Sequence, residues 1–341
     1  MIEEIYARCP EMFNAARTRA GSDWFAAEEH THERHKFTLF PSIEVLAKFR
    51  DYQIGGIGLE PIDHMLSDQT FSLFQKIQNP NYSQEKFKLG MVQYANASAE
   101  ILKKLSGMSG IPKFSKNLFD IFVCNLVEVR SNGGLFGTIE ANKREVLTSI
   151  FAARTAHRSA IAAELYLSEN PAPPHAIMEL GGGFGKSLAD LVRIFPDAVA
   201  IYVDLPVNMA IAAHYFDGRF PGRVNLVWCE TETVRPGMIN VVAPWLIDKI
   251  DLQIDLMINF LSMHHMPQRT MDFYFARLIA PRVRFFYHEN RLEPRAQNLG
   301  EGELRLSPKR AGMDVRHSIE IPWGVSEKAT FSELICNPAV T

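Results

Sequence analysis

The sequence predicts an α/β protein whose second half forms a doubly wound, mostly parallel sheet, preceded by a helical N-terminal domain. Three observations support this prediction. From residue 176 onward, short apolar runs alternate with helical segments, a pattern typical of a parallel sheet covered by helices on both faces. The last two apolar runs are joined without a helix, which predicts an antiparallel hairpin at the edge of the sheet. Residues 1–165 instead show mostly helical spacing.

The N-terminal domain is expected to span residues 1–168. Apolar residues recur at intervals of three and four in PSIEVLAKFRDY (41–52) and in SAEILKKLSGM (98–108), as in amphipathic helices. A longer helix is expected over 142–167. The proline-rich stretch 168–176 ends it, because proline cannot continue a helix. The second domain is therefore expected to span residues 169–341.

The second domain is expected to alternate strands and helices along the chain. Each predicted strand is a short apolar run rich in branched side chains, and each predicted helix shows helical spacing. The strands are expected at 176–180, 198–205, 224–230, 254–260 and 283–289, the helices at 186–195, 206–216 and 269–279, and the final hairpin at 314–322 and 330–337.

Composition narrows the functional class. The 341 residues suffice for about two domains, and 47% hydrophobic with 22% charged residues is typical of a soluble protein with a sizeable core. A net charge of −3 without a basic block argues against a nucleic-acid partner. The sequence shows no signal segment and no apolar run long enough for a membrane. The four cysteines are widely separated, which fits reduced thiols. We therefore expect a cytoplasmic protein that binds neither nucleic acid nor membranes.

A glycine-rich loop separates the first predicted strand of this domain from its helix, in IMELGGGFGKSLADLV (177–192). A phosphate-binding P-loop, G-x-x-x-x-G-K-[ST], needs glycine where Leu180 stands. The dinucleotide pattern G-x-G-x-x-G fails as well, because Lys186 occupies its third glycine position. The pattern that remains is E-x-G-x-G-x-G, made by Glu179, Gly181, Gly183 and Gly185.

A second acid, Asp204, ends the next predicted strand. At the carboxyl end of a strand, an aspartate can accept hydrogen bonds from two ribose hydroxyls, each worth about 1.5–3 kcal/mol. The strand, loop, helix, strand and acid together predict a ribose-bearing ligand without a large polyphosphate. S-adenosylmethionine is such a ligand.

These motifs resemble a class I S-adenosylmethionine-dependent methyltransferase over residues 176–337, including the terminal hairpin. More narrowly, three stretches resemble the bacterial sugar O-methyltransferases: IEVLAKFRDYQIGGIGLE (43–60), MELGGGFGKSLADLVRIFPDAVAIYVDLP (178–206) and DLMINFLSMHHMP (255–267). The resemblance implies a Rossmann-like fold and S-adenosylmethionine as cofactor. It places Glu179 and the loop glycines at the methionine portion, Asp204 and Leu205 at the ribose, Glu230 and Thr231 at the adenine, and Asn259 and Phe260 at the sulfonium.

The catalytic base is expected among three histidines. His264 and His265 stand where the resembling family has an acidic residue after its D-L-x-I-N-x-x-S stretch, and His288 ends the fifth predicted strand. A positioned base accelerates deprotonation of a hydroxyl by about 10²–10⁴-fold, and histidine suits that task near neutral pH. The choice between His264 and His265 stays open, and either one is alternatively a cap of the helix that begins near Pro267.

Other side chains are candidates for binding. Glu289 and Asn290 are candidate ligands of acceptor hydroxyls, and Trp24 is a candidate to stack on the acceptor. Arg154 is a candidate partner of the cofactor's carboxylate, with a structural or solvated arginine as the alternative. No metal is predicted, because the three histidines of EEHTHERH (28–35) do not share one face of a helix or strand.

Three functions remain open at this point. The first is O-methylation of a sugar or small natural-product hydroxyl. The second is N-methylation of a small amine or guanidino compound, such as a free amino acid, with Glu28, Glu29 or Glu289 holding the cation. The third is a non-catalytic module that keeps the cofactor pocket. The resemblance also implies a small-molecule acceptor and a homodimer, with the helical domain covering the acceptor.

Overall fold

The computed structural model describes residues 2–18, 124–125, 137–141, 144–148, 150–263, 266, 268–291, 312–321 and 330–340. The helices expected over 41–52 and 98–108, and the segment that holds Trp24 and the three histidines of 28–35, lie outside the described residues. So do His264 and His265, and the side chain of Arg154. The division between residues 168 and 169 stays a prediction.

One sheet of eight strands organises the described chain, in the order β5-β6-β4-β3-β7-β8-β10-β9. Neighbouring strands from β5 to β8 are parallel, whereas β10 is antiparallel to both β8 and β9. The predicted mostly parallel sheet with an antiparallel C-terminal hairpin is thereby confirmed. The strands are β3 (Ala176–Leu180), β4 (Val199–Val203), β5 (Val224–Val227), β6 (Ile239–Val242), β7 (Ile254–Phe260), β8 (Val283–Arg291), β9 (Asp314–Ile321) and β10 (Thr330–Cys336).

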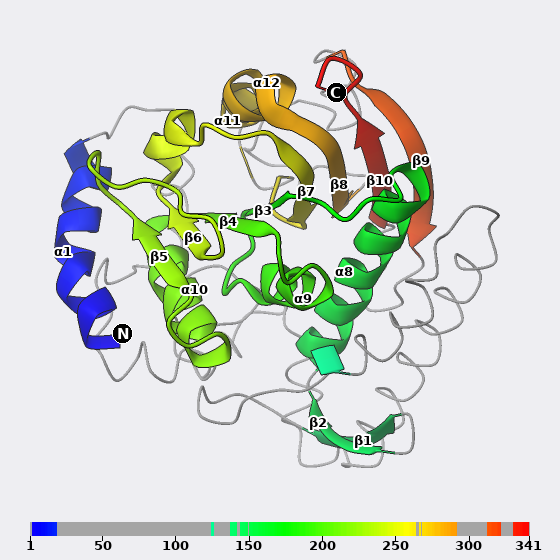
Figure 1. Ribbon diagram of the computed structural model, residues 1–341, viewed down its shortest axis with the longest axis horizontal. Coiled ribbons are helices and arrows are strands. Elements are labelled where there is room, and N and C mark those ends of the chain that lie inside the picture. Colours follow the sequence, from blue (N-terminus) through cyan, green and yellow to red (C-terminus); the bar gives the residue numbers. More distant parts are fainter. Residues whose placement is uncertain are drawn as a thin grey trace.

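Helices cover both faces of this sheet, as its continuous apolar strands require. Figure 1 shows α8, α9 and α10 on one side of the strands and α11 and α12 on the other. The helices are α8 (Ile150–Glu169), α9 (Lys186–Ile194), α10 (Pro206–Arg219), α11 (Gln268–Tyr274), the π-helix η6 (Phe275–Ile279) and α12 (Ala280–Arg282), with a 3₁₀-helix, η4 (Pro244–Lys249), after β6.

Several elements differ from the sequence-based prediction. β6 was not predicted, because it follows β5 without a helix between them and so departs from the alternation of strands and helices. The helix expected over 142–167 begins later than predicted. Residues Arg144–Thr148 instead form β2, which pairs antiparallel with β1 (Gly137–Ala141). The alternation in REVLT is a strand pattern, and pairing with β1 overrides the helical spacing that follows it.

The first helix, α1 (Ile2–Thr18), lies against the sheet domain beside α10 (Figure 1). Ile5, Cys9 and Met12 recur at helical spacing and are buried, so the apolar face of α1 packs inward. On its polar side, Arg8 forms an ion pair with Glu232 at 2.5 Å. The described N-terminal residues therefore join the same core as the sheet.

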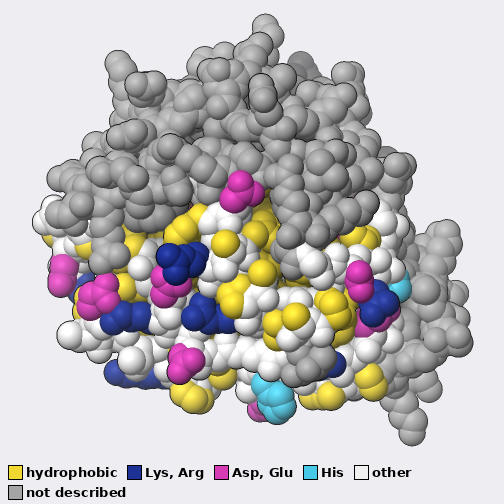
Figure 2. All heavy atoms as spheres, turned by 90° about the horizontal axis from the view of Figure 1, so that it is seen from above, with side chains coloured by type: hydrophobic (Ala, Val, Ile, Leu, Met, Phe, Trp, Pro, Cys, Tyr) yellow, Lys and Arg dark blue, Asp and Glu magenta, His cyan; other side chains and the backbone are white. Residues whose placement is uncertain are grey.

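The surface carries mixed charges. Figure 2 shows acidic and basic side chains interspersed with apolar ones over the described part of one face. Each of the four cysteines is a free thiol. Among the helices that the structure describes, none combines the length and the apolar character needed to cross a bilayer.

Candidate functional site

The glycine loop joins β3 to α9 at the carboxyl edge of the sheet. Gly181, Gly183 and Gly185 have φ angles of 69°, 63° and 83°, in the left-handed region that glycine adopts without strain. Gly181 N–H donates to the carbonyl of Val203 at 2.8 Å, which ties the loop to the end of β4. The predicted sharp turn is therefore present.

The loop backbone packs closely against its neighbours. A Cβ atom at Gly181 would lie 2.2 Å from Ser262 Oγ, and one at Gly185 would lie 2.4 Å from a ring carbon of Phe216. A Cβ at Gly182 would lie 2.1 Å from the carboxyl carbon of Glu179. Glycine is therefore needed at these positions for space as well as for conformation.

Glu179 lies beneath the loop and is fully buried. Its Oε2 accepts the N–H of Leu188 at 3.0 Å, which caps the first turn of α9 because Gly185 has no side chain to do so. Its Oε1 has no hydrogen-bond partner. Burial raises the pKa of Glu179 to about 8, and the nearby charges of Asp204 and Asp190 also raise it, against the hydrogen bonds from Leu188 and Ser187.

Asp204 connects the loop to α10. Its Oδ2 accepts the N–H of Gly183 at 2.7 Å and lies 2.9 Å from the hydroxyl of Tyr202. Its Oδ1 accepts the N–H of Leu205 at 2.6 Å and the side-chain amide of Asn208 at 3.1 Å. Burial raises the pKa of Asp204 to about 6, although these hydrogen bonds lower it. The predicted loop and the predicted acid are thus in direct contact.

Tyr202 and Asn208 were missed by the sequence analysis. Tyr202 precedes Asp204 by two residues on β4, and Asn208 follows it by four on the first turn of α10. Asp204 precedes the N-cap of α10, Leu205, so helical spacing does not predict this contact.

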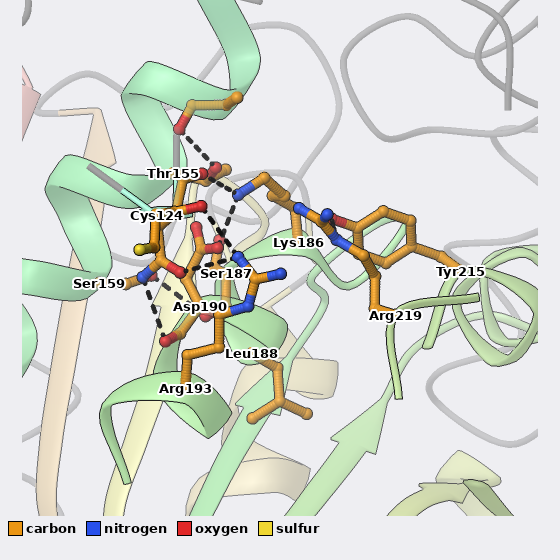
Figure 3. Close-up of polar contacts among 12 residues, drawn as sticks. Cys124, Thr155, Ser159, Lys186, Ser187, Leu188, Asp190, Arg193, Tyr215 and Arg219 are labelled. Atoms are coloured by element: carbon orange, nitrogen blue, oxygen red, sulfur yellow. Dashed lines mark hydrogen bonds and ion pairs between the residues drawn. The ribbon is translucent and has the colours of Figure 1, made fainter. Parts of the chain in front are cut away.

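The side chain of Lys186 turns away from the glycine loop and into the protein interior. Its ammonium forms an ion pair with Asp190 at 2.6 Å, and it donates to the carbonyl of Asn125 at 2.7 Å. Figure 3 shows Lys186 and Arg193 directed at this cluster, where Arg193 donates to the carbonyl of Cys124 at 3.0 Å. In a P-loop the corresponding lysine contacts phosphates, whereas here it is held by Asp190 and by the carbonyl of Asn125.

Asn259, near the end of β7, contacts the residue that precedes the glycine loop. Its side-chain amide donates to the carbonyl of Leu180 at 2.7 Å and to Ser262 Oγ at 2.5 Å. Leu261 follows with a φ of 54°, an uncommon conformation for a residue with a side chain and one that recurs at functional sites. The side chain of Asn259 is fully buried, and its place at the sulfonium stays a prediction.

Phe260 contacts a buried ion pair that the sequence did not reveal. Arg158 on α8 donates two hydrogen bonds to Glu289 on β8, at 2.9 and 2.6 Å, and its guanidinium lies 5.6 Å from the centre of the Phe260 ring. The sequence analysis singled out Arg154, one turn earlier on the same helix. Glu289, predicted to contact the acceptor, is already paired.

His288 lies within β8, which continues to Arg291, so the prediction that His288 ends the strand was wrong. The residue is 1% exposed. Its Nε2 lies 3.4 Å from Glu333 on β10, and its Nδ1 lies 3.3 Å from the side-chain amide of Asn290. Asn290 in turn donates to Asn259 at 3.2 Å. These side chains form a buried polar network behind the loop.

Glu230 and Thr231 follow β5, the third strand of the predicted series, but the strand next to β4 is β6. Both residues are exposed, and Glu230 pairs with Lys249 at 2.7 Å. Their place at the adenine stays a prediction. The residues that follow β6 are Ala243, Pro244 and the partly buried Trp245.

Within the described part of the chain, no cluster of three or more histidine, cysteine, aspartate or glutamate side chains is arranged to hold a metal ion.

No protein-family model matches the chain, and no curated protein matches it. Among solved structures, it is similar to the mitomycin 7-O-methyltransferase MmcR at 14% identity, over 55% of this chain and 56% of that one, with a TM-score of 0.37. It is also similar to magnesium protoporphyrin IX methyltransferase from Synechocystis PCC 6803 with bound S-adenosylmethionine, at 13% identity over 55% and 85% of the chains (TM-score 0.38). A third is the 1,6-didemethyltoxoflavin-N1-methyltransferase of Burkholderia thailandensis, at 16% identity over 53% and 78% (TM-score 0.37).

Proposed function

We propose that this protein is an S-adenosylmethionine-dependent methyltransferase. The observation that carries the proposal is the 2.7 Å hydrogen bond from Gly183 N–H to Asp204. It joins the glycine loop after β3 and the carboxylate after β4 into one site at the carboxyl edge of the sheet, where open α/β sheets bind their ligands.

The residues of the site fit this cofactor. The glycines of the loop carry no Cβ that would keep a ligand from their backbone, and Asp204 supplies acceptors for ribose hydroxyls in place of its bonds to Tyr202 and Asn208. Lys186 is paired with Asp190, which disfavours a polyphosphate. Trp245, after β6, offers an aromatic wall for the adenine. When bound, S-adenosylmethionine supplies a methyl group on a positively charged sulfur.

The acceptor that fits best is a hydroxyl of a sugar or small natural product. An amine acceptor would need a carboxylate to hold its cation. Of the three candidates, Glu289 is neutralised by Arg158, and Glu28 and Glu29 lie outside the described residues. A hydroxyl instead needs a base. We assign this base to His264 or His265, which follow Met263 after β7. A positioned base accelerates the reaction by about 10²–10⁴-fold.

The cofactor test is a calorimetric titration with S-adenosylmethionine and S-adenosylhomocysteine. We expect wild-type protein to bind both, and Asp204→Ala to weaken binding by about 10-fold or more, since each charge-assisted hydrogen bond is worth about 1.5–3 kcal/mol. Asp197→Ala, at an exposed acid, is the matched control and keeps wild-type affinity. Folded protein that binds neither ligand would contradict the proposal.

The acceptor test follows with methyl-labelled cofactor and a panel of sugars, other hydroxylated compounds and amines. Label on a hydroxylated compound, lost in His264→Ala or His265→Ala, supports O-methylation. Label on an amine, retained in both variants, supports N-methylation instead.

A further inference from the structure

Two buried carboxylates lie on either side of the glycine loop. Glu179 on β3 pairs in register with Tyr202 on β4, and Asp204 follows Tyr202 by two residues. The Glu179 carboxyl lies directly under Gly182, and the Asp204 carboxyl holds the N–H of Gly183. A ligand seated on the loop therefore lies close to both acids.

Among the residues that the structure describes, the charged side chains that act on these two acids are negative ones. From β4 and α9, the main charges acting on Glu179 are those of Asp204 and Asp190, both negative. The main groups acting on Asp204 are neutral donors from the loop, β4 and α10, and Tyr274 of α11 also faces it. Lys186, the cation on the first turn of α9, is paired with Asp190. The N-terminal N–H groups of α9 and α10 supply the partial positive charge that remains.

Such a pair is poorly suited to carry two charges without a cation nearby. Burial raises the pKa of Glu179 to about 8 and that of Asp204 to about 6, and Glu179 Oε1 has no hydrogen-bond donor. At neutral pH the pair without a cation nearby therefore holds a proton, whereas a neighbouring positive charge favours its ionised form.

We propose that Glu179 and Asp204 discriminate the charge of the cofactor: the pair is fully ionised when the positively charged methyl donor is bound and takes up one proton from solvent when the neutral thioether product replaces it. The inference rests on the proposed cofactor. The two acids would then favour binding of S-adenosylmethionine over S-adenosylhomocysteine. The product lacks the positive charge that stabilises the second ionised carboxylate.

The experiment counts protons. Calorimetric titrations of wild-type protein at pH 7, in buffers of different ionisation enthalpy, give the protons released on binding each ligand. We expect S-adenosylmethionine to release close to one proton more than S-adenosylhomocysteine, which shares its amino-acid and nucleoside parts. As the pH falls from 8 to 6, the Kd of S-adenosylmethionine should rise by up to about tenfold per pH unit. The Kd of S-adenosylhomocysteine should rise much less.

Two variants test whether Glu179 is the group that releases and takes up the proton. Glu179→Gln keeps the shape of the side chain and should abolish the difference between the two ligands. Glu164→Gln is the matched control, since Glu164 is a second buried carboxyl, on α8, with a pKa raised to about 7 by burial, and it should keep the difference. Equal proton release for the two ligands in wild-type protein would overturn the inference while leaving the cofactor in place. If wild-type protein bound neither ligand at any pH, the proposed cofactor itself would be contradicted.

Discussion

A single methyl group at Gly182 tests how closely the loop lies on Glu179. In Gly182→Ala the new Cβ would meet the Glu179 carboxyl carbon at 2.1 Å, so the loop must lift or the carboxyl must move. We expect the free energy of unfolding to fall by about 1–3 kcal/mol, as in other overpacked sites, and S-adenosylhomocysteine to bind more weakly. Urea denaturation and calorimetry measure the two effects.

Gly218→Ala is the control for this substitution. Gly218 lies on α10 and a Cβ there meets nothing within 4 Å, so alanine should stabilise the helix by about 0.5–1 kcal/mol. If Gly182→Ala matched this control in stability and in binding, the contact between the loop and Glu179 would have no energetic weight.

The sequence predicted the residues whose role depends on local spacing. The loop glycines and Asp204 belong to one continuous strand, loop and helix pattern, so their proximity follows from chain geometry. Arg158 could not be predicted in this way. Its role depends on which turn of α8 faces β8, and Arg154, one turn earlier, has the same side chain. The contact depends on tertiary packing, which residue spacing alone does not specify.

At the scale of elements, the pair of Arg158 and Glu289 joins α8 to β8. Both side chains are buried, so removing one leaves the other charge without a partner in a low-dielectric site. Arg158→Ala is expected to lower the free energy of unfolding by about 3–5 kcal/mol. The double variant Arg158→Met, Glu289→Gln should recover much of this loss, because neither charge is then buried alone. Urea denaturation of wild-type protein, Arg158→Met, Glu289→Gln and the double variant gives the coupling energy.

The exposed pair of Lys249 and Glu230 is the control for burial. Its side chains are 38% and 57% exposed, so Lys249→Ala should change stability by about 0–1 kcal/mol. A loss in Arg158→Ala as small as that in Lys249→Ala would show that Arg158 and Glu289 do not hold α8 on the sheet.

Strands followed from the sequence where a helix separates one strand from the next. β3 and β7 are each followed by a helix and were predicted as observed. β6 follows β5 without a helix between them, so the alternation of strands and helices did not reveal it. Its Asn240 has a buried amide that donates to the carbonyl of Ala200 at 3.1 Å, and the side-chain oxygen of Asn240 accepts the N–H of Arg235 at 2.8 Å. The strand order that puts β6 rather than β5 next to β4 could therefore not be predicted.

At the scale of the whole molecule, segments far apart in the sequence meet around α9. Lys186 and Arg193 donate to the carbonyls of Asn125 and Cys124, and Ser159 of α8 donates to the carbonyl of Ser187 at 3.1 Å. The helix that carries the loop is thus fixed from the N-terminal side as well as by the sheet. These contacts link the position of the loop to residues that precede the sheet.

The protein without cofactor is expected to lose stability as the pH rises from about 6 to about 9. Burial raises the pKa of Glu179 to about 8, of Glu164 to about 7 and of Asp204 to about 6, from ordinary values of 4.5, 4.5 and 3.8. The folded state therefore binds more protons than the unfolded chain across this window. Stability is greatest below the ordinary values and is lost as the pH rises through each raised pKa.

Thermal unfolding at pH 6, 7, 8 and 9, at constant ionic strength, measures this dependence, with Tm falling along the series. Glu179→Gln should flatten the part between pH 6 and 8, and Glu164→Gln the part between pH 6 and 7. Saturating S-adenosylmethionine should also flatten the curve, since a bound cation favours the ionised pair that high pH produces. A Tm that stays constant or rises from pH 6 to 9 would show that these carboxyls are ionised in the folded protein, and that their charge is compensated without a ligand.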